Sequence, residues 1–267
     1  MKPISKTAFY CCGVRMQDAA SANPVCDDTY AKVFMNDDGL AILDAFKDET
    51  RPNASNVARH RIIDDLLQQE ISNQPDLLIV IIGAGFDSRA FRLQGGSWVE
   101  LDEPQVISYK NERLPAANAD NDLQRISIDF ASESLEHKLA RFSNRSPVVV
   151  IEGVFMYLGQ EAIDDLLKTL GRLFPKHKLI CDLMTRQFFQ DFGRTLHEKI
   201  TGMGASFKAT VDSPEELFLK AGYELKDKIS IIEKTVLFQM PDITGTELEA
   251  MGSSLPTGYS IYVFEKR

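Results

Sequence analysis

Residues 77–93 read LLIVIIGAGFDSRAFRL, and this stretch decides the fold. The unbroken apolar run Leu77–Ile82 is rich in Ile, which is typical of a central parallel strand buried on both faces. The turn Gly83-Ala84-Gly85 has no bulky side chain, and residues 87–93 can begin a helix. A strand, a small-residue turn and a helix N-terminus together bring backbone close to a ligand. We therefore predict a ligand site at this turn.

The segments that follow continue the alternation of strand and helix. Further strands are expected at 97–102, 124–128, 147–151, 178–184, 223–232 and 258–266. Helices are expected at 104–117, at 160–174 and from 213 onward, where Ser, Pro and Glu form a capping box. This order predicts an α/β fold with a doubly wound, Rossmann-like, seven-stranded sheet. Such sheets bind ligands at the carboxyl ends of their strands.

The length of 267 residues suits a single domain with a sizeable core. We divide it into an N-terminal helical cap (1–70), a ligand-binding core (76–185), an insertion (186–212) and a C-terminal helix with strands (213–267). The insertion breaks the alternation and is rich in Phe and Gly. It is predicted to be a lid or part of a substrate pocket; a packed helix followed by a loop is the alternative.

Composition restricts the classes of partner. The net charge of −9 argues against a nucleic-acid partner. No apolar run approaches the roughly 20 residues of a membrane span, and the N-terminus lacks a signal-peptide core, so a cytoplasmic protein without a membrane partner is expected. The four cysteines and four histidines lack metal-ligand spacing, so no metal is predicted. The oligomeric state is left open.

Acidic residues follow the predicted strands. Asp102 ends the second strand, at about the distance from Gly85 at which α/β nucleotide folds place the carboxylate that binds ribose hydroxyls. Asp129 and Phe130 follow the third strand, and Glu152 directly follows the fourth. These side chains are predicted to gather at one edge of the sheet. The alternatives are an exposed strand-end acid at 102, a helix cap at 129 and a helix-start acid at 152.

Two arginines of the helix predicted at 57–69 differ in their surroundings. Arg61 has Asp64 and Asp65 three and four residues later, which is typical of a solvated ion pair. Arg59 has Ile residues at those spacings and lies on the apolar face, where a cation needs an anion. Arg59 is therefore predicted to meet an anionic ligand group; a buried structural salt bridge is the alternative.

Two cofactor classes fit a glycine turn of this kind. A dinucleotide site requires G-x-G-x-x-G, but Ser88 stands at the third glycine position and Asp87 would repel a pyrophosphate. S-adenosylmethionine has no phosphate; it carries a ribose, an adenine, a sulfonium cation and an amino-acid end. A glycine turn beside several acids suits that molecule, and Arg59 is left to meet its carboxylate.

Several blocks, in order, resemble the leucine carboxyl methyltransferase family, a branch of the class I S-adenosylmethionine-dependent O-methyltransferases. These blocks are Ser5–Ala8, Asp28–Ala31, Ala58-Arg59, Ile82–Leu93, Glu100–Pro104 and Glu152–Leu158. The resemblance spans about residues 5–185 and is most specific at the glycine turn and in the block that begins at 152. Position 29 is Thr where the family usually has Pro, and position 88 is Ser where it often has Thr. The resemblance implies the class I methyltransferase fold and S-adenosylmethionine as the cofactor.

The resemblance also implies roles for individual residues. The cofactor would be approached by Gly83, Ala84 and Gly85 with Asp87 beside them, and its carboxylate bound by Arg59 with Lys6 or Thr7. Its ribose would be bound by Asp102, its adenine by Asp129 and Phe130, and its amine or methyl site by Glu152. Tyr157 and Tyr10 are the candidates for orienting an acceptor.

Methyl transfer needs alignment and exclusion of water more than a strong base. A carboxylate acceptor has no proton to lose, whereas a hydroxyl acceptor needs a base. We expect an S-adenosylmethionine-dependent O-methyltransferase that acts on a carboxylate or hydroxyl of a small-molecule acceptor. The alternatives are a nicotinamide-dependent oxidoreductase, a protein C-terminal carboxyl methyltransferase and a scaffold without turnover.

Overall fold

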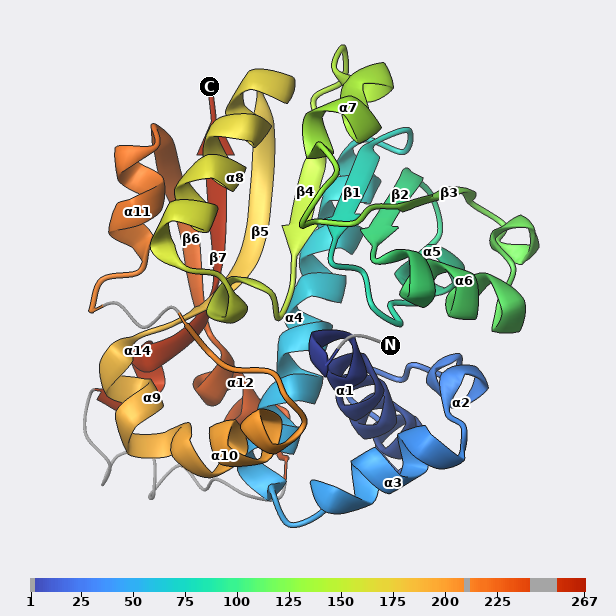
Figure 1. The fold of residues 1–267 in the computed structure, drawn as a ribbon, viewed down its shortest axis with the longest axis vertical. Coiled ribbons are helices and arrows are strands. Elements are labelled where there is room, and N and C mark those ends of the chain that lie inside the picture. Colours follow the sequence, from blue (N-terminus) through green and yellow to red (C-terminus); the bar gives the residue numbers. More distant parts are fainter. Residues whose placement is uncertain (1–2, 209–211, 241–253) are drawn as a thin grey trace.

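The computed structural model describes residues 3–208, 212–240 and 254–267, and a seven-stranded sheet forms its centre (Figure 1). The strands are β1 Leu78–Ile82, β2 Ser97–Asp102, β3 Asp122–Ser127, β4 Val148–Ile151, β5 His177–Met184, β6 Tyr223–Ser230 and β7 Tyr259–Lys266. Their order is β3-β2-β1-β4-β5-β7-β6. Strands β1 to β5 pair in parallel, and β7 is antiparallel to both of its neighbours. The predicted doubly wound α/β fold is confirmed.

Strand β1 lies at the centre because every residue in it is apolar and buried. Alternate side chains of a strand point to opposite faces, so Ile79 and Ile81 enter one apolar cluster while Leu78, Val80 and Ile82 enter the other. The strand therefore joins two cores, one on each side of the sheet.

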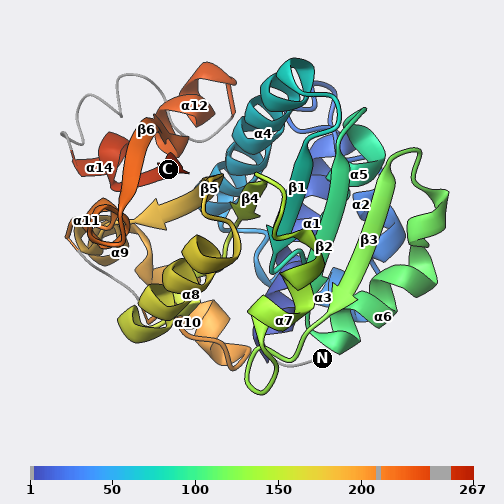
Figure 2. The same cartoon turned by 90° about the horizontal axis from the view of Figure 1, so that it is seen from above.

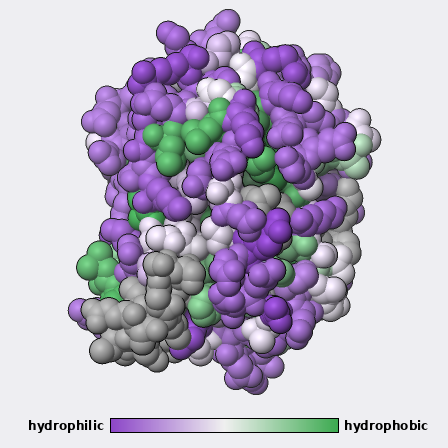
Figure 3. Space-filling model, turned by 90° about the vertical axis from the view of Figure 1, so that its left-hand side faces the viewer, coloured by the Kyte–Doolittle hydropathy of each residue, from purple (hydrophilic) through white to green (hydrophobic). Residues whose placement is uncertain are grey.

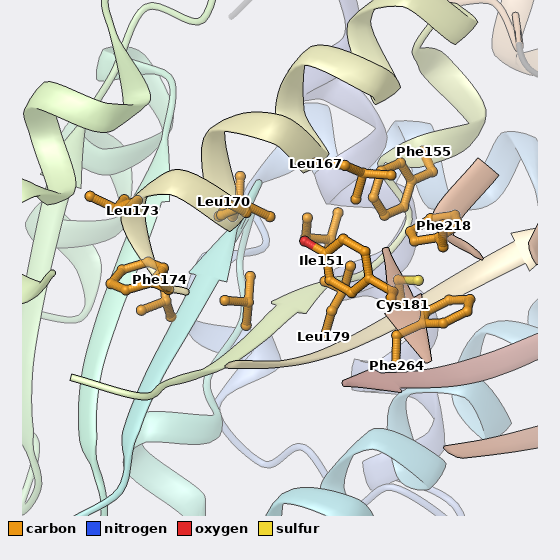
Figure 4. Packing of buried hydrophobic residues seen from close by; sticks show 14 of the residues in the cluster. Ile151, Phe155, Leu167, Leu170, Leu173, Phe174, Leu179, Cys181, Phe218 and Phe264 are labelled. Carbon is orange, nitrogen blue, oxygen red and sulfur yellow. The ribbon is translucent and has the colours of Figure 1, made fainter. Parts of the chain in front are cut away.

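Helices cover both faces of the sheet, as Figure 2 shows. One face packs against α4 Thr50–Asn73, α5 Arg89–Arg92 and α12 Ile231–Leu237. The other packs against α7 Leu135–Leu139, α8 Gln160–Leu173 and α11 Glu215–Lys220. Figure 4 shows this second core, where Leu167 and Leu170 of α8 lie over Leu179 of β5 beside the ring of Phe264. Helix α6 Pro104–Arg113 connects β2 to β3.

The N-terminal helices lie near the lower ends of β1 and β4 in Figure 1. They are α1 Pro3–Ala19, α2 Ala31–Phe34 and α3 Asp37–Ala45. Phe9 of α1 and Phe34 of α2 both pack on Phe86, which follows the glycine turn, with ring centroids 4.8 and 5.2 Å apart respectively. The N-terminal cap is thereby attached to the turn that the sequence singles out.

Helices α9 Arg186–Phe192 and α10 Arg194–Gly202 follow β5, and α14 Ser254–Gly258 precedes β7. Short 3-10 turns complete the described elements: η1 Ala116–Asn118, η2 Ala140–Phe142 and η3 Phe155–Tyr157. The face in Figure 3 is mainly hydrophilic, with hydrophobic residues in a few small groups. Among the described helices, none is both long and apolar enough to span a bilayer.

Several predicted bounds are wrong, and the helix expected at 104–117 ends at Arg113. The strand expected at 223–232 ends at Ser230, whose side chain accepts the N–H of Glu233 and begins α12. The capping box expected at Ser213 is absent, since α11 starts at Glu215 without a side-chain cap. The segment after the glycine turn forms only the single helical turn of α5.

Candidate active site

The turn after β1 is fixed by its own backbone. Gly83 has a φ of +73°, and a Cβ atom there would lie 2.6 Å from Cγ2 of Val154, so glycine is required. The N–H groups of Gly83 and Ala84 both donate to the carbonyl of Leu101, at 2.9 and 3.0 Å. The turn is therefore tied to the end of β2 and presents almost no side chain.

Asp102 locks the same turn from the end of β2. One of its carboxylate oxygens accepts the N–H of Gly85 at 2.6 Å, and the other accepts the N–H of Glu103 at 2.7 Å. Burial raises the pKa of Asp102, although both N–H groups oppose the rise. Asp102 is thus a buried, oriented carboxylate rather than the exposed strand-end acid of the alternative.

A cavity of about 600 Å³ lies against the turn and the carboxyl ends of β1, β2 and β4. This volume is in the range of small-molecule sites. Most residues of the predicted site line it: Thr7, Arg59, Gly83, Ala84, Gly85, Asp87, Asp102, Phe130, Glu152 and Tyr157. The structure therefore brings together residues from six separate regions of the chain.

Arg59 is buried and bonded to two carboxylates and a phenol, and its Nη2 also lies 4.0 Å from Sγ of Cys11. Its Nε donates to Glu152 at 3.0 Å, and its Nη1 donates to Asp182 at 3.1 Å and to Tyr259 at 2.8 Å. Arg59 thus lies in a buried ion-pair network, as the alternative expects, and also lines the cavity. Its contact with a ligand carboxylate stays a prediction.

Arg89 is the centre of a second buried network. Its guanidinium contacts Asp87 at 2.5 Å, Glu152 at 2.8 Å, Asp64 at 2.5 Å and Nδ1 of His60 at 2.7 Å. His60, Asp87 and Glu152 bring possible metal-ligand atoms within 4.8 Å of one another. The guanidinium already lies among these atoms and supplies the positive charge that a metal ion would bring.

These charges set the protonation of the cavity wall. Burial alone would raise the pKa of Glu152, but Arg89, His60 and Arg59 outweigh it and hold that pKa well below its usual range. Burial, helped by Arg89, lowers the pKa of His60. The wall therefore presents an ionised Glu152 beside a neutral His60 near pH 7.

The structure changes the meaning of Asp87. Its carboxylate is paired with Arg89 and also accepts the N–H of that residue at 2.7 Å. This pairing compensates the charge, so the argument that Asp87 repels a pyrophosphate is weakened. The remaining obstacle to a dinucleotide is Ser88, which is fully buried at the third glycine position and donates to Asp28.

Asp28 anchors the N-terminal cap to the glycine turn. It is fully buried and accepts hydrogen bonds from Nε of Arg15 at 2.9 Å and from Oγ of Ser88 at 2.5 Å. Arg15 also donates to the carbonyl of Phe86 at 2.8 Å. Helix α1 is consequently docked on the turn, where Arg15 and Thr7 contribute to the cavity wall.

A second cavity of about 350 Å³ adjoins the first. Five residues line both: Thr7, Cys11, Arg59, Gly153 and Tyr157. The insertion predicted at 186–212 contributes Phe188, Phe192, Leu196, Ile200 and Phe207. The described residues of this insertion form two packed helices, α9 and α10, and a following loop. They lie in the wall of the second cavity, and the expected motion of the insertion as a lid stays a prediction.

Three predicted residues lie away from the first cavity. Lys6 is exposed and lines neither cavity, so of Lys6 and Thr7 only Thr7 lies in the wall. The carboxylate of Asp129 is absent from that wall and accepts Ala131 N–H and Ser132 Oγ in a local turn, while Ser134 caps the following helix, so Asp129 is not the helix cap of the alternative either. Tyr10 lines the second cavity and donates to Asn53.

Sequence reasoning missed Arg89, His60 and Cys11. Arg89 lies within the quoted stretch, four residues after Gly85, and its position two residues after Asp87 is the available signal. Asp64 was assigned to Arg61, since pairs three or four residues apart are common on exposed helix faces. In the structure Arg61 pairs with Asp65 at 2.7 Å, while Asp64 is buried against Arg89. A one-dimensional spacing does not show which partner lies across the fold.

Comparison with known proteins gives a family. Residues 9–171, more than half of the chain, match the leucine carboxyl methyltransferase family. The chain belongs to this family. A putative S-adenosyl-L-methionine-dependent methyltransferase of Mycobacteroides abscessus is 32% identical over 123 residues, which are 43% of this chain and 40% of that protein. A relative of the same description from Frankia alni is 29% identical over 64% of this chain and 65% of its own length.

The chain is also similar to a protein that is named for a specific pathway. The tetracenomycin polyketide synthesis O-methyltransferase of Streptomyces glaucescens is 23% identical over 67% of this chain and 65% of its own length. The chain thus spans less than two thirds of the length of several relatives.

Solved structures agree on the fold. A DUF574 family protein from Streptomyces avermitilis has a TM-score of 0.61 at 11% identity, covering 89% of this chain and 95% of that one. Magnesium protoporphyrin IX methyltransferase from Synechocystis, solved with bound S-adenosylhomocysteine, has a TM-score of 0.52 at 14% identity, covering 90% of this chain and 100% of that one. At these identities the likeness concerns the architecture of the sheet and its helices.

Proposed function

We propose that the chain binds S-adenosylmethionine in the first cavity and transfers its methyl group to an oxygen of a small-molecule acceptor. The observation that carries the proposal is the convergence of the glycine turn, Asp102 and Glu152 on one cavity of suitable size. Membership of the methyltransferase family and the names of the curated relatives support the cofactor. When bound, this cofactor supplies a methyl group activated by a sulfonium cation.

Each polar group of the cofactor has a complementary residue. The oriented carboxylate of Asp102 suits ribose hydroxyls, because charge-assisted hydrogen bonds are strong. Phe130, which is 45% exposed at the cavity wall, suits an adenine face. Arg59 and Thr7 suit the carboxylate, and the ionised Glu152 suits the amine. Asp129 is not proposed to contact the adenine; its role is to order the turn in which Phe130 lies.

The acceptor is proposed to occupy the second cavity. The five shared residues form the boundary at which two reacting molecules would meet. Tyr157 lies at this boundary, and Tyr10 lies in the second cavity. Burial raises the pKa values of both phenols, so they are suited to orient an acceptor by hydrogen bonding and not to remove its proton.

The boundary favours an acceptor oxygen that is already ionised. The five described residues that line both cavities include no carboxylate and no imidazole, and the three carboxylates of the second cavity, Asp48, Glu49 and Asp191, line that cavity alone. Glu152 and His60 line the first cavity, but Arg59, Arg89 and Arg92 engage them. A carboxylate has no proton to lose, so it needs no general base. We therefore propose a carboxylate acceptor ahead of a hydroxyl one.

Three segments of the chain would have separate roles in binding the cofactor and the acceptor. We propose that residues 76–185 hold the cofactor, that the cap at 1–70 closes one side of its cavity, and that the insertion at 186–212 encloses the acceptor. Exclusion of water by these segments would favour methyl transfer.

The proposal is tested by incubating the purified protein with methyl-labelled S-adenosylmethionine and a panel of aromatic carboxylic acids and of phenols. We expect a labelled methyl ester together with S-adenosylhomocysteine. The Asp102→Ala variant serves as a control for the site and should form less ester at limiting cofactor. Labelled ethers from phenols, with no ester, would reject the carboxylate preference. A folded protein that binds the cofactor and methylates no member of either class would reject the transferase function.

A further inference from the structure

An asparagine in the wall of the second cavity has a side-chain oxygen without a hydrogen-bond partner among the described residues. Asn56 of α4 is 6% exposed and lines this cavity, and its Oδ1 has no hydrogen-bond partner among the described residues. Its Nδ2 donates to Sγ of Cys11 at 3.1 Å. Buried polar atoms are nearly always paired, so an unpaired one beside a cavity indicates a ligand group.

A second asparagine of the same helix shows what a structural role looks like. Asn53 uses both ends of its amide: Oδ1 accepts the hydroxyl of Tyr10 at 2.8 Å, and Nδ2 donates to the carbonyl of Phe46 at 3.0 Å. Those bonds connect α4 to its neighbours and account for Asn53. Asn56 makes only the bond to Cys11, which leaves half of its amide without a structural role.

The amide orientation does not alter this conclusion. If the amide of Asn56 were turned over, Oδ1 would face the thiol of Cys11 and Nδ2 would be the unpaired group. In either orientation one amide group is free, and the terminal torsion of an asparagine is soft enough for a ligand to draw that group toward itself. A hydroxyl is the matching ligand group because it both donates and accepts.

The surroundings indicate what carries this hydroxyl. Aromatic and apolar residues form a large part of the wall of this cavity, namely Tyr10, Met156, Tyr157, Phe188, Phe192 and Phe207, and charged residues, Asp48, Glu49, Arg51, Arg59 and Asp191, also line it. Such a wall suits a flat ring, and Ser55 is a buried polar neighbour in the same wall. Cys11, the partner of Asn56, also lines the first cavity, so this polar position lies close to the boundary between the two cavities.

We propose that Asn56 is a specificity-determining residue that binds a ring hydroxyl of an aromatic acceptor. The inference rests on the proposed function, because it takes the second cavity as the acceptor site. It defines the substrate class more narrowly, as hydroxylated aromatic carboxylic acids. Asn56 acts by positioning the ring and takes no part in bond making.

The test compares two probes, 6-hydroxy-2-naphthoate, whose hydroxyl lies too far from the carboxylate to bond to it, and 2-naphthoate, by isothermal titration into protein with S-adenosylhomocysteine present. We expect the wild type to bind the hydroxylated probe about tenfold more tightly, since a polar site rejects an analogue that leaves it unpaired. Asn56→Leu should remove this preference, and Asn56→Ser, which is smaller, should reduce it if the Leu variant does not fold. Gln69→Leu, at an exposed position of the same helix, is the matched control and should keep it.

Equal binding of both probes by the wild type, binding of neither at millimolar concentration, or a preference that survives in Asn56→Leu would overturn the inference. A preceding titration with S-adenosylhomocysteine alone reports on the proposed cofactor. If S-adenosylhomocysteine does not bind, the proposed function is contradicted. The comparison of the two naphthoates decides the role of Asn56 separately.

Discussion

Asp102 connects two segments that line the first cavity, the glycine turn and the end of β2. It accepts the N–H of Gly85 from the turn and that of Glu103 from its own strand end. Its side chain therefore serves both the shape of the turn and the proposed contact with ribose. The two contributions are separable, because an asparagine keeps one acceptor oxygen but lacks the charge.

We predict that Asp102→Ala weakens the binding of S-adenosylmethionine by at least tenfold, about 1.4 kcal/mol, through loss of charge-assisted hydrogen bonds. Asp102→Asn should fall between the wild type and the alanine variant. Isothermal titration measures both, with circular dichroism to verify that the variants are folded. An alanine variant with the affinity of the wild type would reject the assignment of this residue.

At the level of residues, the sequence predicts acids that end strands better than acids that pair across the fold. Asp102 and Glu152 follow apolar runs, and the rule that parallel strands share a carboxyl edge places them together. Lys6 has no such constraint, since it lies on a helix before the first strand. The partners of Arg59 lie 93 and 123 residues away in the chain, and no local pattern indicates them.

Two polar side chains of α10, Lys199 and Thr195, hold this helix to the N-terminal cap. Nζ of Lys199 lies 2.9 Å from Glu49 and donates to the carbonyl of Ala45 at 3.0 Å. Thr195, one turn earlier in α10, also donates to Glu49 at 3.3 Å. These contacts close the second cavity at the side where α10 meets the cap.

We predict that Lys199→Met loosens α10 without affecting the cofactor site. Amide hydrogen exchange across 194–202 should accelerate about two- to fivefold, because partly exposed ion pairs contribute roughly 0.5–1 kcal/mol. Lys220→Met, which removes an exposed pair in α11, is the control and should leave exchange across 194–202 unchanged. Unaltered exchange in α10 of Lys199→Met would show that apolar packing alone holds the helix.

At the level of elements, the strands were predictable because uninterrupted Val and Ile runs next to Gly or Pro are typical of buried strands. The end of β6 was not, because Ile231 and Ile232 favour a strand by composition. Ser230 decides otherwise by capping α12, and this cap is a contact that periodicity does not report. The insertion was the least predictable part, since its phenylalanines fit both a lid and a packed helix.

The molecule as a whole depends on a buried ion network that joins the cap, the glycine turn and the far strands. Its members are Arg15, Asp28, Arg59, His60, Asp64, Asp87, Arg89, Arg92, Glu152 and Asp182. Burial, with nearby arginines, keeps His60 neutral, while the same arginines keep the carboxylates ionised. Folding stability should therefore respond to acid in two steps.

The sign of each step follows from the pKa shifts. The folded-state pKa of His60 lies below its ordinary 6.5, so its contribution is present above pH 6.5 and is lost as the pH falls below that value. Asp64 and Asp87 have pKa values below the ordinary 3.8. Their contribution to folding stability is therefore lost only as the pH falls below about 4.

We predict that the melting temperature is nearly constant from pH 8 to about 7, declines below about 6.5 and declines further below about 4. His60→Gln should make the first decline smaller and keep the second; the part that remains is expected from His177, whose pKa burial also lowers. His137→Gln, at an exposed histidine, should keep both. Scanning calorimetry across this range measures the profile, and a first decline of unchanged size in His60→Gln would contradict the contribution of His60.

The central claim is that the first cavity is a site for S-adenosylmethionine, and direct calorimetric titration tests it. We predict binding of one S-adenosylmethionine per chain, weakened in Asp102→Ala, with no binding of reduced nicotinamide cofactor under the same conditions. A well-folded protein that gives no binding signal with S-adenosylmethionine at high micromolar concentration would contradict the account.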